Sequence, residues 1–293
     1  MQVIRASVLG FCMGVRRAVE LAYREAGGGG KIYTLGSLIH NPYVSVSLRN
    51  QGIGILKEEE LPPDLQGATV IIRAHGITPA LEGALVRRGA RLADATCPKV
   101  KSGQMKARAL TEGGYRIFLA GEAQHGEVIG LCGYAPDCLV VGNPWEAKAQ
   151  AEKLSSQGRK VKTALLGQTT ISSEEYQSIA AEIQRYFPDL EIIDTICQAT
   201  KERQRALTRL CDAADAVVIV GGKESANTRR LLAIAQARSK PAWLVESVGD
   251  IPADIDAYST VGLSAGASTP DNLITLIERA LISHCERPVG DTG

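Results

Sequence analysis

Residues 94–97 read Asp-Ala-Thr-Cys, and residues 194–197 read Asp-Thr-Ile-Cys. These D-x-x-C segments lie 100 positions apart (197 − 97); each ends a predicted strand, and each is followed by a basic, helix-period stretch. Near the N-terminus, Gly10-Phe-Cys12 also ends a predicted strand and begins a basic helix. Self-similarity at fixed spacing can define a whole architecture, so the sequence predicts three degenerate copies of one unit.

The residues downstream of each cysteine support this repeat. The residue 24 positions after each cysteine is a glycine that ends an apolar strand: Gly36, Gly121 and Gly221. The residues 28 positions after it lie on the following loop and are His40, His125 and Ser225. Those 30 positions after it are Pro42, Glu127 and Asn227. Each copy continues to a second strand and a second polar loop, at residues 74–78, 167–170 and 264–269.

Short apolar runs alternate with helix-period stretches, which predicts an α/β fold with mainly parallel sheets. The predicted strands are 2–9, 31–35, 69–73, 115–120, 138–142, 161–166, 190–196, 215–220, 242–246 and 260–263. The predicted helices between them include 15–25, 100–112, 173–187, 200–213, 228–238 and 271–283. We expect three similar α/β domains in a pseudo-threefold arrangement, at 13–96, 97–193 and 194–285. The N-terminal strand within 1–12 would complete the third, and 286–293 would form a frayed tail.

Composition excludes several classes of protein. The 293 residues include 33 Lys and Arg against 32 Asp and Glu, so a nucleic-acid partner is not expected. No apolar run has the roughly 18 residues that a membrane span needs, and the residues Met-Gln-Val-Ile-Arg at 1–5 do not begin the charged and apolar pattern typical of a signal peptide. The seven cysteines are an odd number without a C-x-x-C pair, which does not suit a disulfide framework. We therefore expect a cytoplasmic protein.

Ligands bind at the carboxyl ends of parallel strands, where Cys12, Cys97 and Cys197 are expected to meet. Three thiolates cannot make a closed four-cysteine zinc site, but they can hold three irons of a [4Fe–4S] cluster and leave the fourth iron open to a substrate. The remaining cysteines are interpreted as ordinary packing residues: Cys132, Cys138, Cys211 and Cys285. A metal pair at Cys132 and Cys138 is the alternative.

Three of the four histidines, His40, His75 and His125, fall on the loops that should converge, and His284 is interpreted as a surface residue. The other loop residues are hydroxyl and amide donors: Thr169, Thr170, Ser225, Asn227, Ser264 and Ser268. Such donors at helix N-termini bind phosphate, and without a P-loop a small-molecule phosphate or diphosphate fits better than ATP. Glu127, two residues beyond His125, is the candidate proton donor.

Ordered motifs from residue 4 to about residue 283 resemble those of the iron–sulfur 4-hydroxy-3-methylbut-2-enyl diphosphate reductases of the non-mevalonate isoprenoid pathway. They are Gly10-Phe-Cys12-Met-Gly14-Val-Arg-Arg-Ala18, Ile39-His40-Asn41, Ala74-His75-Gly76, Asp94-Ala-Thr-Cys97-Pro98, His125-Gly-Glu127, Gln168-Thr169-Thr170, Asp194-Thr-Ile-Cys197-x-Ala-Thr200 with Arg203-Gln204, Ser225-Ala-Asn227 and Gly266-Ala-Ser268.

The resemblance implies three α/β lobes around a [4Fe–4S] cluster held by Cys12, Cys97 and Cys197. It implies reductive dehydroxylation of the allylic diphosphate to isopentenyl and dimethylallyl diphosphate, with electrons from ferredoxin or flavodoxin. Glu127 would supply protons, relayed through Thr169, and His125 would also belong to the catalytic set. The implied diphosphate ligands are His40, His75, His125, Thr169, Ser225, Asn227 and Ser268.

Two positions depart from the family pattern. Gly126 stands where the family usually has proline, and Ala226 stands where it usually has a second serine. These departures leave open slower turnover, or a paralogue that acts on another diphosphate or unsaturated small molecule. Two other classes also stay open: a non-catalytic iron–sulfur protein that senses redox state, and a zinc hydrolase that uses the histidines.

Overall fold

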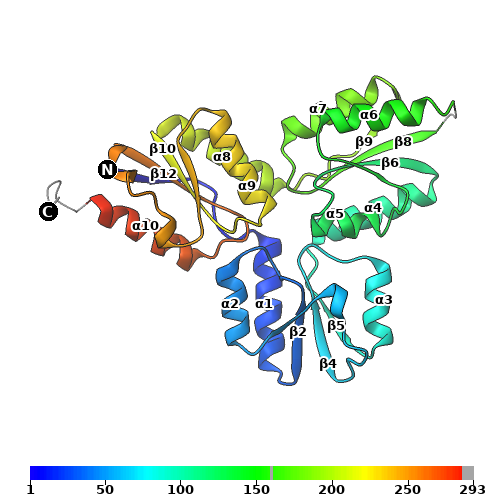
Figure 1. Ribbon diagram of the computed structural model, residues 1–293, viewed down its shortest axis with the longest axis horizontal. Helices are drawn as coiled ribbons and strands as arrows, with labels where there is room; N and C mark the ends of the chain where they lie inside the picture. Colours follow the sequence, from blue (N-terminus) through cyan, green and yellow to red (C-terminus); the bar gives the residue numbers. More distant parts are fainter. Residues whose placement is uncertain (159–160, 286–293) are drawn as a thin grey trace. The chain divides into compact units, whose positions relative to one another are not determined.

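The computed structural model describes residues 1–158 and 161–285 (Figure 1). The expectations for the side chains of His284 and Cys285 and for the tail at 286–293 fall outside what it describes. The chain forms two compact units. Unit 1 contains Met1–Met13, His40–Ser47 and Ala199–Gly293, and unit 2 contains Gly14–Ile39 and Leu48–Gln198.

Unit 1 is built on one parallel sheet of four strands in the order β1-β12-β10-β11. The strands are β1 (Gln2–Arg5), β10 (Ala216–Val220), β11 (Ala242–Val245) and β12 (Thr260–Ala265). β1 pairs with β12, with Gln2 opposite Thr260, so the N-terminal strand completes the third sheet. β1 is shorter than the predicted strand at 2–9, and an ion pair between Arg5 and Glu278 connects it to α10 (Asp271–Cys285).

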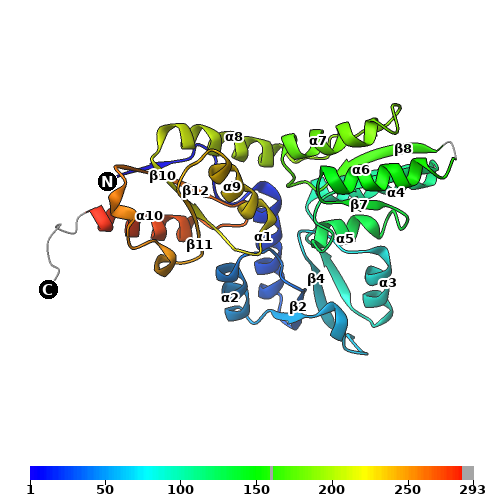
Figure 2. The ribbon, with the colours of Figure 1, turned by 45° about the horizontal axis from the view of Figure 1, so that its top comes forward.

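Helices cover both faces of this sheet. Val217 and Ile219 belong to a core cluster with residues of α8 (Gln198–Ala213) and α9 (Ala226–Ala237), whereas Val218 and Val220 belong to one with residues of α10. Figures 1 and 2 show α10 on one side of the strands and α8 and α9 on the other. Alternate side chains of a strand point to opposite faces, which explains why β10 is apolar throughout.

Unit 2 contains two further parallel sheets, ordered β3-β2-β4-β5 and β7-β6-β8-β9. Their strands are β2 (Lys31–Leu35), β3 (Gly54–Leu56), β4 (Ala68–Ile72), β5 (Arg91–Asp94), β6 (Tyr115–Ala120), β7 (Leu139–Val141), β8 (Lys162–Gly167) and β9 (Glu191–Ile192). In all three sheets the first strand after a cysteine lies between the second and the third, and the fourth strand leads to the next cysteine. The predicted α/β class and the three similar parallel sheets are thus confirmed; the domain boundaries stay a prediction.

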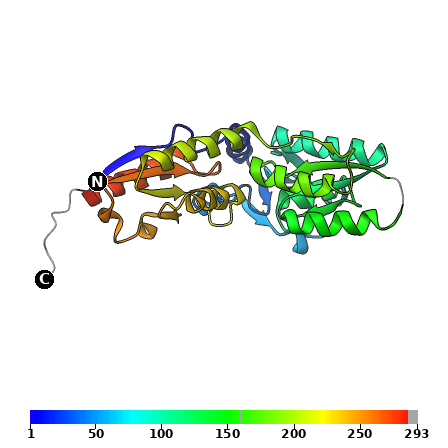
Figure 3. The same cartoon turned by 90° about the horizontal axis from the view of Figure 1, so that it is seen from above.

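The remaining helices are α1 (Met13–Gly27), α2 (Pro42–Asn50), α3 (Pro79–Arg87), α4 (Pro98–Glu112), α5 (Gly126–Cys132), α6 (Pro144–Ser155) and α7 (Ser173–Gln184), with 3-10 turns at Glu58–Glu60, Val248–Asp250 and Ile255–Ala257. Around β6, the core on one face includes residues of α4 and α5 and the core on the other includes residues of α6 and α7. In the view from above, helices flank the strands of unit 2 on both sides (Figure 3). Within the described ranges, no helix has the length and apolar character to cross a membrane.

Candidate functional site

The three repeat cysteines share one backbone environment. Each donates its N–H to a carbonyl on the polar loop that follows the third strand of its sheet. The pairs are Cys97 to Ala74 at 3.0 Å, Cys197 to Thr169 at 3.0 Å and Cys12 to Ala267 at 3.1 Å. The repeat therefore extends from spacing in the sequence to individual hydrogen bonds.

Each of these cysteines also stands at the N-terminus of a helix. Cys97 is the N-cap of α4, and Cys12 and Cys197 immediately precede α1 and α8. All three are partly exposed. The thiolate is the form of cysteine that ligates iron. Three thiols placed in this way fit the ligand set of an iron–sulfur cluster.

Side chains around the cysteines hold the loops in place. The Arg17 guanidinium donates to the carbonyl of Thr96 at 3.0 Å, and the buried Arg203 donates to the carbonyl of Gly10 at 2.6 Å. In the D-x-x-C segments the aspartate accepts the N–H two residues on, at 2.9 Å for Asp94. Burial raises the pKa of Asp94, but hydrogen bonds from Thr96 and the nearby Lys101 lower it, and the net shift is downward.

Gly14 packs directly against one cysteine. A Cβ at position 14 would lie 2.5 Å from Sγ of Cys97 and 3.2 Å from its Cβ. Because such separations are too short for non-bonded atoms, only glycine at this position leaves room for the Cys97 side chain. This explains the glycine in the Cys12-Met-Gly14 motif.

Unit 2 holds a buried acid connected to one of the cysteines. Glu127 is only 2 % exposed; its Oε1 accepts the Thr169 N–H at 2.7 Å, and its Oε2 accepts the Thr169 hydroxyl at 2.8 Å. The carbonyl of the same threonine accepts the N–H of Cys197. Thr169 therefore connects the carboxylate directly to a cysteine loop.

Two histidines lie beside this acid. His125 is the N-cap of α5, and its Nδ1 accepts the N–H of Glu127 at 3.2 Å. This hydrogen bond assigns the proton of the neutral ring to Nε2. The rings of His125 and His75 meet edge to face, with their centroids 5.1 Å apart. Two imidazoles and a carboxyl group from two segments, one after β4 and one after β6, are therefore gathered at the strand ends of unit 2.

Unit 1 brings together hydroxyl and amide groups. Ser225 caps α9 by accepting the N–H of Thr228 at 3.3 Å, and the hydroxyl of Ser268 donates to the carbonyl of His40 at 3.2 Å. Asn227 is 5 % exposed, and its Nδ2 has no hydrogen-bond partner among the described residues. A buried donor without a partner is suited to an anionic ligand.

The predicted site residues thus divide into two sets, one in each unit. Unit 1 contains Cys12, His40, Ser225, Asn227 and Ser268, and unit 2 contains His75, Cys97, His125, Glu127, Thr169 and Cys197. That both sets face one centre stays a prediction.

Arg73 is a residue of this region that the sequence reasoning missed. A Cβ at position 126 would lie 3.2 Å from its Nε and Nη2. Its side chain is 13 % exposed and forms an ion pair with Glu58. The glycine that replaces the usual proline therefore leaves space for this guanidinium. The one available signal was the position of Arg73, directly before the Ala74-His75 motif.

A family model described as LytB protein matches residues 3–282. The chain belongs to the LytB family. The chain is also similar to the 4-hydroxy-3-methylbut-2-enyl diphosphate reductase of Treponema denticola. The two are 42 % identical over 289 residues, and the match covers 96 % of this chain and 99 % of that relative. The match spans nearly all of both chains, so the similarity is not confined to one lobe.

Two solved structures extend the comparison. The chain resembles the E-1-hydroxy-2-methyl-but-2-enyl-4-diphosphate reductase from Plasmodium falciparum with a TM-score of 0.86 at 28 % identity, covering 98 % of this chain and 89 % of that one. It resembles a structure of (E)-4-hydroxy-3-methyl-but-2-enyl diphosphate reductase, described as the terminal enzyme of the non-mevalonate pathway, with a TM-score of 0.68 at 37 % identity, covering 97 % and 100 %. The family resemblance inferred from the motifs is confirmed.

Proposed function

We propose that this LytB-family protein is a 4-hydroxy-3-methylbut-2-enyl diphosphate reductase. The reaction breaks the bond between the allylic carbon and the hydroxyl oxygen, consumes two electrons and two protons, and releases water with isopentenyl or dimethylallyl diphosphate. The observation that carries the proposal is the pair of hydrogen bonds between buried Glu127 and Thr169, a residue that also bonds Cys197. A proton donor held next to a candidate iron ligand is what a reductive dehydroxylation requires.

Cys12, Cys97 and Cys197 would hold a [4Fe–4S] cluster, because each is a partly exposed thiol at a helix N-terminus. When bound there by three protein ligands, such a cluster would supply the electrons and a coordination position for the substrate hydroxyl. Zinc hydrolysis is the less favoured chemistry, because it gives no role to three equivalent thiols.

The diphosphate would be bound by two groups of side chains. Unit 1 offers Ser225 and Asn227 at the start of α9, together with Ser268 and His40; unit 2 offers His75, His125 and Thr169. Neutral donors and a helix N-terminus stabilise the phosphate charge without fixed cations, and His40 and His75 would add positive charge when protonated.

Glu127 is the proposed source of protons, and Thr169 is the proposed relay. The carboxyl group and the threonine hydroxyl are 2.8 Å apart, which permits direct proton exchange, while the N–H of Thr169 fixes the carboxyl orientation. The hydrogen bond from the Glu127 N–H to His125 keeps the imidazole beside the acid. In this scheme Glu127 and Thr169 move the proton, and His125 orients and binds the diphosphate.

The electrons would come one at a time from a small redox protein, ferredoxin or flavodoxin, because the sequence has no nicotinamide or flavin fingerprint. Thiolate ligands are retained best in a reducing compartment, and we therefore place the protein in the cytoplasm.

The test is an anaerobic assay of the iron-loaded protein with 4-hydroxy-3-methylbut-2-enyl diphosphate, dithionite and a mediator. The proposal expects both C5 diphosphates as products. A loaded cluster with no conversion of this substrate would contradict it. Turnover of another allylic or unsaturated diphosphate would then identify a paralogue, and ligand-dependent changes in the cluster without any turnover would identify a redox sensor.

A further inference from the structure

Cys132 and Cys138 lie outside the proposed site, yet their sulfurs meet. Sγ of Cys138 is 3.0 Å from Sγ of Cys132, and both residues are partly exposed. Two successive turns produce this approach: Ala135 donates its N–H to the carbonyl of Cys132 at 3.1 Å, and Cys138 donates to that of Ala135 at 2.9 Å. The backbone thus holds the pair together without a covalent bond.

The contact makes the two thiols chemically unequal. The hydrogen bond from Cys138 lowers the pKa of Cys132, and the same contact, together with burial, raises the pKa of Cys138. Since the thiolate is the nucleophile in disulfide exchange, Cys132 is the attacking sulfur and Cys138 is the resolving one.

A metal site does not account for the pair. Two sulfurs are too few ligands for a zinc ion. In the part of the chain that the structure describes, no third cysteine, histidine or carboxylate lies close enough to complete a metal site with them. The metal-pair alternative weighed for these cysteines is therefore not supported.

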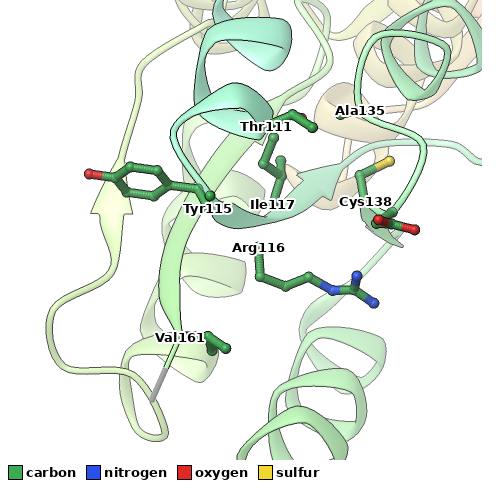
Figure 4. A pocket seen from close by; sticks show the side chains of 9 residues that line it. Thr111, Tyr115, Arg116, Ile117, Ala135, Cys138 and Val161 are labelled. Atoms are coloured by element: carbon green, nitrogen blue, oxygen red, sulfur yellow. The ribbon is translucent and has the colours of Figure 1, made fainter. Parts of the chain in front are cut away.

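A surface pocket of about 290 Å³ is lined by Cys138, whose Sγ contacts Sγ of Cys132. Its lining also includes the Arg116 guanidinium, the Asp137 carboxylate and Tyr115, and Figure 4 shows Arg116 and Cys138 along the same hollow. The pocket gives a small molecule room beside Cys138, and its two charged side chains suit a ligand that carries charges of both signs.

We propose that Cys132 and Cys138 form a thiol–disulfide exchange site whose substrate is a small disulfide with charged groups of both signs, such as oxidised glutathione. The Cys132 thiolate attacks one sulfur of the disulfide, forming a mixed disulfide and releasing one small thiolate. Cys138 loses its proton and attacks Sγ of Cys132, which closes the protein disulfide and releases the second thiolate. The two protons from the protein pass to the two small thiolates, so two protein thiols are oxidised and one small disulfide is reduced.

The test measures this exchange in the anaerobic holoprotein. Samples equilibrated with oxidised and reduced glutathione are quenched in acid, alkylated and digested. Trypsin places both cysteines, and no other, in the peptide 117–148. Cleavage before Asp137 then separates Cys132 from Cys138 unless they are bridged. We expect the bridged peptide to become the dominant form as oxidised glutathione increases, and to disappear with dithiothreitol.

The folded protein and the variants provide the controls. The exchange equilibrium should favour the bridge about ten-fold more in the native protein than in the isolated 117–148 peptide, because the native turns preorganise the sulfurs. Cys138→Ser should trap glutathione on Cys132, while buried Cys211 should stay unmodified. Full alkylation of both cysteines at every glutathione ratio, or equal bridging in the native protein and the peptide, would overturn the proposal.

Discussion

Replacing Glu127 by glutamine tests the proposed proton donor with the smallest structural change. The carboxylate accepts the N–H of Thr169 at 2.7 Å and its hydroxyl at 2.8 Å. Glutamine keeps one acceptor oxygen for the N–H. Its amide can then face the hydroxyl, which rotates and accepts instead of donating. The side chain therefore keeps its place but can no longer donate a carboxyl proton.

The expected effects on stability and on catalysis differ in size. Exchanging two charge-assisted hydrogen bonds for neutral ones costs on the order of 1 kcal/mol of unfolding free energy. Loss of a general acid lowers kcat by about 10²–10⁴-fold, equivalent to about 3–5 kcal/mol in the activation barrier. The loss of activity should therefore exceed anything that the change in stability explains.

The assay measures kcat, iron per chain and Tm on the same anaerobic preparation. Glu174→Gln is the matched control, because Glu174 is also in the first turn of a helix but is exposed and lies outside the proposed site. The reasoning fails if Glu127→Gln keeps more than about a tenth of the wild-type kcat at full iron loading.

Three further changes follow from contacts in the structure. Gly14→Ala should abolish iron binding, because its Cβ would lie 2.5 Å from Sγ of Cys97; iron analysis measures this. Gly126→Pro should lower the free energy of unfolding by about 0.5–1 kcal/mol more when Arg73 is present than in an Arg73→Ala background, because the proline ring crowds the guanidinium. A double-mutant cycle of urea unfolding measures this coupling. Glu278→Gln should cost up to about 1 kcal/mol at pH 7 and progressively less in acid.

The acid effect depends on the sign of one shift. The hydrogen bond from Arg5 lowers the pKa of Glu278 below 4.5 in the folded protein. The ion pair therefore stabilises the fold above that pH and is lost as the pH falls through the folded pKa. A cost that is constant, or larger, towards pH 3 would contradict this assignment.

Each glycine substitution has its own check. Gly27→Ala lies on the same helix as Gly14 but has no atom within 4 Å of its Cβ position, so it should retain iron. Equal iron loss in both variants would show that helix α1, rather than the contact with Cys97, determines binding. If the effects of Gly126→Pro and Arg73→Ala on the free energy of unfolding are additive, the guanidinium does not explain why residue 126 is glycine.

The sequence predicts the repeat well, because the repeated strands and cysteines have nearly constant spacing. It predicts strand ends less well. Residues 190–196 suggest a full strand, but β9 contains only Glu191–Ile192. Thr195 exchanges hydrogen bonds with the backbone of Gly167, and Asp194 accepts the N–H of Ile196. These side chains replace the strand ladder with a loop leading to Cys197.

Several elements were missed for lack of a helical or strand period. α5 has seven residues and includes Gly126 and Gly130, which weaken any helix signal. The contact between Arg73 and Gly126 depends on how separate loops return in space. Spacing along the chain contains no information about such contacts, whereas it does locate residues that follow equivalent strands.

The most direct test of the central claim is a titration of turnover against iron. Apoprotein is reconstituted anaerobically with increasing iron and sulfide, and each sample is assayed for iron per chain and for reduction of 4-hydroxy-3-methylbut-2-enyl diphosphate. Turnover should rise in proportion to iron and level off at about four irons per chain, with none after loading with zinc. Full turnover without iron, or a fully loaded protein that leaves the diphosphate unreduced, would contradict it.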